Sequence, residues 1–287
     1  GVVCGCGIRG IEKTAKGFTF HTKGGDFYAT KCIMATGGKT LKKSGSDGSG
    51  FLYLESLGHH IIDLVPGLIG LKGKQSFFAD IAGIRADVKV DLYIESTHVC
   101  SEQGELQLTN YGISGIPVFQ LSRVATRALS EQKEVYATLN FVPFWEKEQC
   151  LTYFKERFKK ADEKHIGEAL IGFFPEKLIP VLLEESHIKA AKYANRLQTE
   201  ELESFIDTVQ GLRVDITDWN TFDTAQVTAG GVDTDEINAE TMESKLCPGL
   251  YFAGEMVDID GICGGYNLQW AWSSGAVAGI HVARELS

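Results

Sequence analysis

The sequence lacks any run of about 18 apolar residues, the length that a membrane-spanning helix needs. Its first residues, Gly1-Val2-Val3-Cys4, do not follow the charged and then apolar pattern of a signal peptide. Positive charge is also scarce, because 28 Lys and Arg residues stand against 38 Asp and Glu residues and leave a net charge of -10. An acidic chain repels the phosphates of nucleic acids. The sequence therefore predicts a cytoplasmic protein that binds neither membranes nor nucleic acid.

Cysteines are too few and too scattered for a disulfide framework, since there are seven, an odd number, in 287 residues. Cys4 and Cys6 are separated by one residue, whereas zinc motifs separate their cysteines by two or more, and no cluster of histidines lies nearby. We therefore predict no metal site, and we interpret Cys4 and Cys6 as small buried hydrophobic residues.

Glycine is abundant and unevenly distributed. The chain has 32 glycines, and several of them form clusters at 37–38, 45–50, 230–231 and 264–265. A length of 287 residues with 44% hydrophobic and 23% charged residues is typical of a globular protein with two or three compact units. Glycine clusters in such a chain mark turns or places where the backbone comes close to another group.

The periodicity of the apolar residues changes along the chain. An apolar strand at 32–35 ends at Gly37, and a glycine-rich loop leads into a helix expected at 51–57. Strands are predicted at 88–94, 105–109, 135–141 and 212–216, with a helix after Pro117 whose apolar stripe is Val118, Leu121, Val124, Ala125 and Leu129. Residues 144–210 are charged, poor in glycine and helical in period, and one helix is expected to start at Thr199 and to stop at Gly211.

The region from Leu250 to Gly275 carries the clearest functional signal. It consists of an apolar strand, a turn with Gly254 and Glu255, a second turn with Gly264 and Gly265, and a helix that begins near Asn267. The first amides of a helix lack partners within the helix, so such a start binds anions and dipoles. An acid at the end of the preceding strand is placed to accept hydrogen bonds from ribityl or ribose hydroxyls.

These residues resemble a known family. Ala35–Gly38 with the following 45–57 segment, Tyr111–Gly115, Ala225–Val232 and above all Gly249–Gly275 are similar to the FAD-dependent, aminoacetone-oxidase-like flavoproteins. This group includes BaiN-like bile-acid reductases and lies within the larger glutathione-reductase-type FAD fold. The resemblance runs nearly from end to end, and the last two blocks are its most specific part.

The resemblance implies an α/β fold in which a discontinuous, Rossmann-like FAD-binding domain holds an inserted β-barrel-like domain and a small helical module. The implied division is 1–66 for the first part of the FAD-binding domain, 67–143 for the β-rich insert, 144–210 for the helical module, 211–222 for a return strand of the insert, and 223–287 for the C-terminal part of the FAD-binding domain. It also implies the positions that surround FAD, namely Ala35, Thr36, Gly37, Gly38, Ala229, Gly230, Gly231, Gly254, Glu255, Gly264, Gly265, Tyr266, Asn267, Leu268 and Gln269.

Tyr111 and Tyr266 are the aromatic residues that we expect near the flavin ring, whereas Trp270 and Trp272 are interpreted as core residues. We interpret Cys263 as a structural thiol. All seven histidines, including the adjacent pair His59 and His60, are expected to be structural or exposed. No catalytic side chain is assigned, because hydride transfer is the chemistry of the flavin itself.

The chain departs from the family pattern in two places. Asp47 and Ser49 replace the threonine and the second acid of the usual glycine loop, and no Gly-x-Gly-x-x-Gly motif opens a strand and helix. Since that motif neutralises the pyrophosphate, we expect an N-terminal βαβ unit to be absent and this fragment alone to bind FAD weakly or not at all.

Three functional hypotheses follow. The first is an FAD-dependent oxidoreductase that transfers a hydride between a small organic substrate and flavin N5, with NAD(P)H as a possible electron donor. The second is a catalytically inert fragment that cannot hold FAD. The third is an RNA-modifying flavoprotein of the same broad fold, which the net charge of -10 disfavours.

Overall fold

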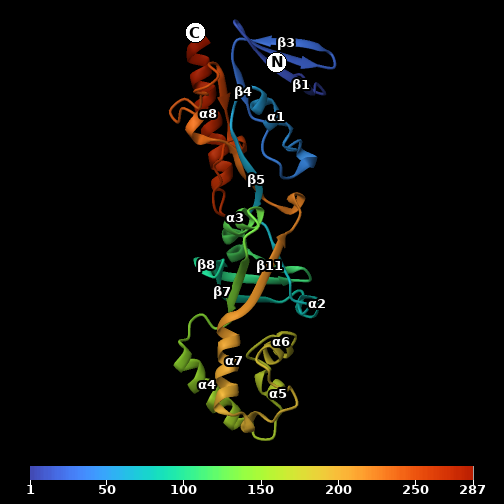
Figure 1. Ribbon diagram of the computed structural model, residues 1–287, viewed down its shortest axis with the longest axis vertical. Coiled ribbons are helices and arrows are strands. Elements are labelled where there is room, and N and C mark those ends of the chain that lie inside the picture. Colours follow the sequence, from blue (N-terminus) through green and yellow to red (C-terminus); the bar gives the residue numbers. More distant parts are fainter. Residues whose placement is uncertain (287) are drawn as a thin grey trace. The chain divides into compact units, whose positions relative to one another are not determined.

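The computed structural model describes residues 1–286, which fold into two compact units (Figure 1). Unit 1 contains residues 1–68 and the chain from Thr221 onward, and unit 2 contains residues 69–220. Each unit has a hydrophobic core of its own. No helix among residues 1–286 has the length and apolar character needed to cross a bilayer.

Three small sheets form the β part of unit 1. Strands β1 (Ile8–Thr14), β2 (Gly17–Thr22) and β3 (Gly25–Ala29) make an antiparallel meander. The remaining strands pair across the sequence: β4 (Cys32–Met34) is parallel to β13 (Leu250–Phe252), and β5 (Ile61–Gly67) is antiparallel to β12 (Val227–Val232). Segments from the two ends of the chain therefore fold together.

Two α-helices lie within the described residues of unit 1. Helix α1 (Ser49–Ser56) begins two residues earlier than predicted, directly after Gly48, whose positive φ of 81° forms the turn. Helix α8 (Tyr266–Leu286) begins one residue earlier than predicted and packs on β13. Short 3-10 turns complete the unit: η1 (Lys42–Ser44), η3 (Phe222–Thr224), η4 (Thr234–Glu236) and η5 (Gly254–Met256).

His59 is a structural residue of the unit 1 core. Its Nδ1 lies 2.8 Å from Glu236 Oε2, its Nε2 lies 3.0 Å from Ser244 Oγ, and its ring meets Phe252 edge to face. Glu236 also accepts the main-chain N–H of His60. This agrees with the structural role predicted for the histidines.

Unit 2 contains a closed barrel of six strands, which confirms the predicted barrel-like insert. The strands follow one another around the barrel as β10 (Val135–Asn140), β11 (Leu212–Trp219), β6 (Leu71–Gly73), β9 (Gly112–Gly115), β8 (Thr97–Thr109) and β7 (Arg85–Ile94). The short helix α2 (Phe78–Ile81) and the helix α3 (Ile116–Ser130) pack on it. Pro117 lies in the first turn of α3, and Val118, Leu121 and Ala125 of the predicted stripe are buried.

Tyr111, expected near a flavin ring, lies in the β8–β9 turn with its hydroxyl close to Gly70.

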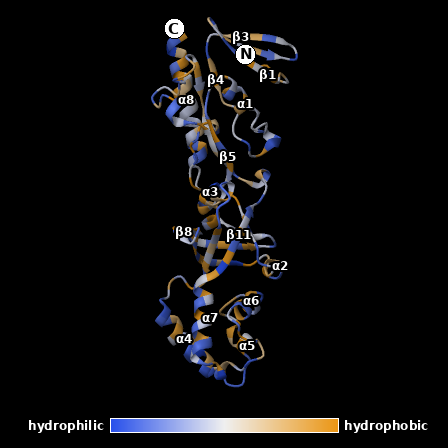
Figure 2. Ribbon diagram, in the orientation of Figure 1, coloured by the Kyte–Doolittle hydropathy of each residue, from blue (hydrophilic) through white to orange (hydrophobic). Residues whose placement is uncertain are grey.

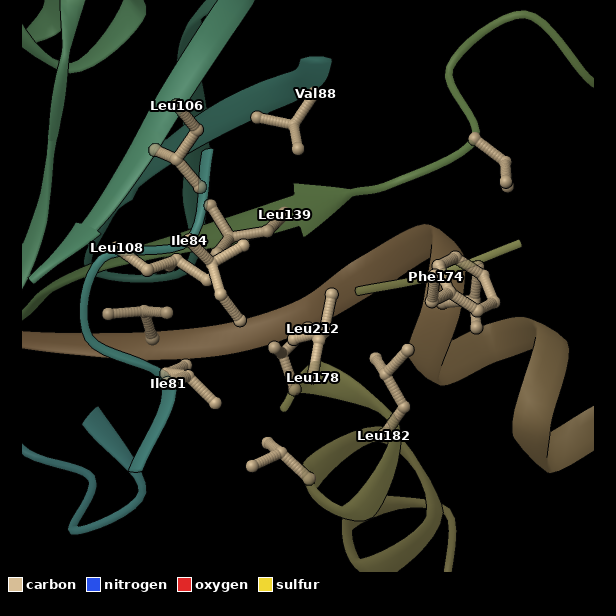
Figure 3. Packing of buried hydrophobic residues seen from close by; sticks show 14 of the residues in the cluster. Ile81, Ile84, Val88, Leu106, Leu108, Leu139, Phe174, Leu178, Leu182 and Leu212 are labelled. Atoms are coloured by element: carbon tan, nitrogen blue, oxygen red, sulfur yellow. The ribbon is translucent and has the colours of Figure 1, made fainter. Parts of the chain in front are cut away.

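The 144–210 segment is helical, as its periodicity predicts, and its helices are α4 (Lys147–Lys160), α5 (Ile166–Leu170), α6 (Leu178–Glu185), η2 (Ala194–Arg196) and α7 (Thr199–Gly211). Helix α7 starts and ends at the predicted residues, and β11 follows it without a loop. The core of the barrel continues into this module, where Leu139 and Leu212 lie near Leu178 and Phe174 (Figure 3). Hydrophilic stretches run along α4 and α7 (Figure 2).

One prediction about cysteine is wrong. Cys4 is exposed and Cys6 only half-buried, although both were expected in the core. Residues 1–7 precede the first strand and form neither a helix nor a strand, so no sheet or helix face covers these side chains.

Candidate functional site

The parallel strands β4 and β13 bring two of the predicted glycine segments to one edge of a sheet. Met34 pairs with Phe252 at the ends of the strands, and the N–H of Ala253 donates to the carbonyl of Met34 at 3.0 Å. Ala35–Gly38 leaves one strand and Gly254-Glu255 leaves the other. In α/β folds, ligands bind at the carboxyl ends of parallel strands.

Glu255 connects this edge to the third glycine segment. Its Oε1 accepts the main-chain N–H of Thr228 at 2.5 Å, and its Oε2 accepts the main-chain N–H of Gly38 at 3.2 Å. The Thr228 hydroxyl oxygen accepts the main-chain N–H of Lys39 at 2.8 Å. The structure thus joins the predicted segments around Gly38, Ala229 and Gly254 through hydrogen bonds.

The Glu255 carboxylate is partly buried among main-chain donors. Each carboxylate oxygen has a main-chain donor, and the expected hydrogen bonds from ribityl hydroxyls to this carboxylate stay a prediction. Burial raises the pKa of this carboxyl, and the N–H groups of Thr228 and Gly38 oppose that rise because they stabilise the ionised form.

Glycine is required at two of these positions because other protein atoms come close. A Cβ atom on Gly38 would lie 2.3 Å from Thr228 Oγ1, and one on Gly230 would lie 2.4 Å from the carbonyl oxygen of Asp63. Atoms cannot approach so closely, so a larger residue would force the segments apart.

Helix α8 is anchored to the same edge through Gly254. The N–H of Gly254 donates to Ser274 Oγ at 2.9 Å, and its carbonyl accepts Trp270 Nε1–H at 3.0 Å. The turn after β13 is therefore held to α8 through both main-chain groups of Gly254. The predicted positions 264–269 lie at the start of α8, so these two hydrogen bonds connect them through the helix to Gly254 and to its neighbour Glu255.

The start of α8 is open. Tyr266 and Leu268 are 59% and 62% exposed, and a Cβ atom on Gly265 would meet nothing within 4 Å. The N–H of Gln269 donates to the carbonyl of Gly265, and the amides before it have no acceptor within the helix. Asn267 fixes the approach to the helix, because its side chain accepts the N–H of Gly261 at 2.8 Å and donates to its carbonyl at 2.9 Å.

The expectation for Trp272 is wrong. Trp270 is half-buried, but Trp272 is 68% exposed. The buried residues of α8 are Ser274 and Ala278, and Trp272 lies two residues before Ser274, about 200° away around the helix axis. Its ring therefore projects away from the core of unit 1.

Three residues of this edge were not predicted from the sequence as part of the site. Thr228 and Asp258 bind main-chain groups of the glycine segments, with Asp258 Oδ1 accepting the N–H of Gly230 at 3.0 Å. Ser46 Oγ is buried without a hydrogen-bond partner and lies where a Cβ atom of Gly37 would come within 2.8 Å. The one signal near Ser46 in the sequence is that Asp47 and Ser49 depart from the glycine loop of the family.

The fifteen predicted positions all lie in unit 1. Ala35 and Thr36 are exposed, and Thr36 donates to Met256 Sδ at 3.3 Å. Amides at the start of α8 that lack an acceptor within the helix, and the buried Ser46 hydroxyl, are groups that a bound polar ligand satisfies. Burial raises the pKa of the Cys263 thiol beside this turn, which disfavours a reactive thiolate. Within residues 1–286, no three His, Cys, Asp or Glu side chains are grouped so that they could hold a metal ion.

Comparisons with known proteins agree with this picture. The family model described as "HI0933-like protein Rossmann domain" matches residues 2–281. The chain is 43% identical over 278 residues to a 3-dehydro-bile acid delta(4,6)-reductase of Clostridium scindens, covering 97% of this chain and 68% of that protein. It is 28% identical to the ribosomal RNA dihydrouridine synthases of Escherichia coli and Haemophilus influenzae, in each case covering 93% of this chain and 64% of the relative. The chain thus spans about two thirds of the length of these relatives.

Proposed function

The chain belongs to the HI0933-like Rossmann-domain family, and on that premise we propose that it is an FAD-dependent oxidoreductase acting on a small organic substrate. The family match and the 43% identity to a bile-acid reductase confirm the resemblance to BaiN-like flavoproteins inferred from the sequence. In this proposal, residues 1–66 and 223–287 form the FAD-binding domain, residues 67–143 and 211–222 form the β-rich insert, and the reaction takes place in the cytoplasm.

The observation that carries the proposal is the open start of α8 beside the joined glycine segments. Gly264 to Gln269 would present main-chain amides to the flavin ring, while Ala35–Gly38 and Ala229–Gly231 would line the rest of the cofactor. A bound flavin supplies hydride transfer at N5. The positive end of the helix dipole at Tyr266 favours negative charge nearby, and so favours a reduced, anionic ring over an oxidised one.

The protein's own part in the reaction is to bind and to orient. Asn267 holds the approach to α8, and Ser274 with Trp270 holds Gly254 against the helix, so the amides at the helix start have a fixed direction. Fixed dipoles do not need to reorganise when charge develops, which is how such groups lower a barrier. The 43% identity to a reductase favours reduction of the substrate, with NAD(P)H as donor, over amine oxidation.

The test is cofactor analysis of the complete gene product followed by anaerobic reduction. The released cofactor is expected to be FAD. The flavin absorption at about 450 nm should be lost on addition of NADH or NADPH and should return when an enone substrate is added. Loss of absorption with a primary amine and not with NAD(P)H would redirect the proposal to amine oxidation. A gene product without any flavin, and with no flavin uptake, would refute it.

A second candidate function is RNA modification. It is favoured by the 28% identity to two ribosomal RNA dihydrouridine synthases over 93% of the chain. The net charge of -10 opposes it, because RNA binding needs cationic side chains to neutralise phosphates. If the protein modifies RNA, it should retard ribosomal RNA fragments in a gel at low salt and produce dihydrouridine. We expect no retardation.

A further inference from the structure

Strand β12 has two different edges. One edge pairs with β5, from Val227 opposite Gly67 to Val232 opposite Ile61. At the other edge two carboxylates accept the N–H groups of alternate residues: Glu255 accepts that of Thr228, and Asp258 accepts that of Gly230. Alternate N–H groups of a strand point to the same side, so at Thr228 and Gly230 these two side chains take the place of a neighbouring strand. Farther along this edge, at Val232, the main chain of Val257 forms a parallel bridge.

Glu255 binds a second segment in addition to this edge of β12. Its second oxygen accepts the N–H of Gly38, which follows the other parallel strand and is 217 residues distant in the sequence. The contact is tight, because a Cβ atom on Gly38 would lie 2.9 Å from Glu255 Cδ. One carboxylate therefore fixes the distance between the Gly38 and Thr228 segments, while its own backbone belongs to the third segment.

The chemistry suits a carboxylate and not an amide. An ionised carboxylate is only an acceptor, so both oxygens can face N–H donors, whereas a glutamine at this position would turn one NH2 group toward a donor. Hydrogen bonds to a charged acceptor are also stronger than neutral ones, which offsets part of the cost of burial.

We infer that Glu255 is a positioning residue, which holds the three glycine-containing segments together before any cofactor binds and does not recognise the ribityl chain. This inference deepens the proposed function and rests on it for the identity of the ligand. It predicts that replacing Glu255 weakens the binding of every part of the flavin by the same factor, because all three segments are displaced together.

The first test measures amide hydrogen exchange in the flavin-free protein. In the unmodified protein the amides of Gly38 and Thr228 should be protected, and in Glu255→Gln at least one of them should exchange about tenfold faster or more, because it loses its acceptor. The matched control is Glu236→Gln, which removes a carboxylate that also binds a main-chain N–H in unit 1 but does not touch the glycine segments. It should leave exchange at Gly38 and Thr228 unchanged.

Exchange of both amides at the rate of an exposed loop in the unmodified protein would overturn the inference. This measurement needs no variant, so the inference stays testable even if Glu255→Gln does not fold. Unchanged protection in a folded Glu255→Gln protein would overturn it as well.

The second test separates positioning from direct recognition. The dissociation constants of riboflavin and of lumiflavin, which has the ring and no ribityl chain, are measured for the unmodified protein, Glu255→Gln and Glu236→Gln. Positioning predicts that Glu255→Gln weakens both ligands by the same factor, about tenfold for one lost charged hydrogen bond. A loss confined to riboflavin would show that Glu255 binds the ribityl hydroxyls and would overturn the inference.

The two proposals fail in different ways. If the complete, unmodified gene product binds neither flavin, the proposed function fails, while the exchange of Gly38 and Thr228 still decides whether Glu255 positions the segments. If both flavins bind and the exchange test fails, the flavoprotein assignment stands and Glu255 has another role.

Discussion

Single residues decide how closely the segments of unit 1 can approach. Gly230 and Gly45 have the same φ of 98°, a left-handed conformation that side chains disfavour. They differ in their surroundings, because a Cβ atom on Gly230 would meet the Asp63 carbonyl at 2.4 Å and one on Gly45 would meet nothing within 4 Å. This pair separates the cost of backbone strain from the cost of crowding.

We therefore expect Gly45→Ala to lower the free energy of unfolding by about 1–2 kcal/mol, the usual cost of the left-handed region for a residue with a Cβ atom. Gly230→Ala should cost about 1–3 kcal/mol more, because the new methyl group also forces β12 away from β5. Urea unfolding of the two variants measures the difference. Equal losses would mean that β12 moves freely and that the close approach is unimportant.

Glu255 should make stability depend on pH in a defined direction. Burial raises its pKa in the folded protein above the ordinary value of 4.5. The folded state then holds the proton more tightly than the unfolded state, so the contribution of this group to stability is fully present below pH 4.5 and is lost as the pH rises through the folded-state pKa. In Glu255→Gln this loss should be absent. Unfolding free energies of both proteins across this range are the measurement, and a difference that grows in favour of the unmodified protein with rising pH would contradict the prediction.

At the scale of elements, the start of α8 depends on its approach loop. Asn267 binds both main-chain groups of Gly261, whereas the side chain of Gln269, two residues later, donates to Ser273 on the exposed surface. The first contact shapes the turn that leads into the helix, and the second does not. The two residues are therefore a natural pair for comparison.

Asn267→Ala should lower the free energy of unfolding by about 1–3 kcal/mol, since two main-chain groups lose their partner. Amide exchange at Gly261 should become faster in the same variant. Gln269→Ala should cost less than about 0.5 kcal/mol, as is usual for exposed substitutions. A similar, small effect of both changes would show that the approach loop keeps its shape without Asn267.

At the scale of the whole molecule, the two units have separate cores. The unit 2 cluster runs from Leu71 to Ile216, and the unit 1 cluster draws only on residues outside this range. The barrel of unit 2 is closed and therefore leaves no unpaired sheet edge. Unit 1 is built from segments at both ends of the sequence.

Residues 69–220 expressed alone should consequently fold. We expect a cooperative unfolding transition, together with a near-UV circular dichroism signal from the packed aromatic residues Phe154, Phe174 and Phe205. Residues 1–68 alone should show neither, because β4 and β5 lack their partners β13 and β12. Gradual, non-cooperative unfolding of the 69–220 fragment would show that unit 2 needs unit 1.

Much of the local structure could be predicted from the sequence, because it depends on neighbours along the chain. Helix α7 follows from the apolar period between Thr199 and Gly211, and α3 from the stripe after Pro117. The glycine clusters and the strand, turn and helix around Gly254 are likewise visible in the sequence. The family resemblance supplied the barrel, which periodicity alone does not predict.

Tertiary structure decided what the glycine segments contact. The carboxylate of Glu255 meets Gly38 and Thr228, which lie 217 and 27 residues away, and no local pattern encodes such a hydrogen bond. The exposure of Trp272 and Cys4 could not be predicted from the sequence either, since burial depends on which other elements cover a side chain. Local preferences select helices, strands and turns, whereas the partners of a polar group are fixed only when distant segments pack together.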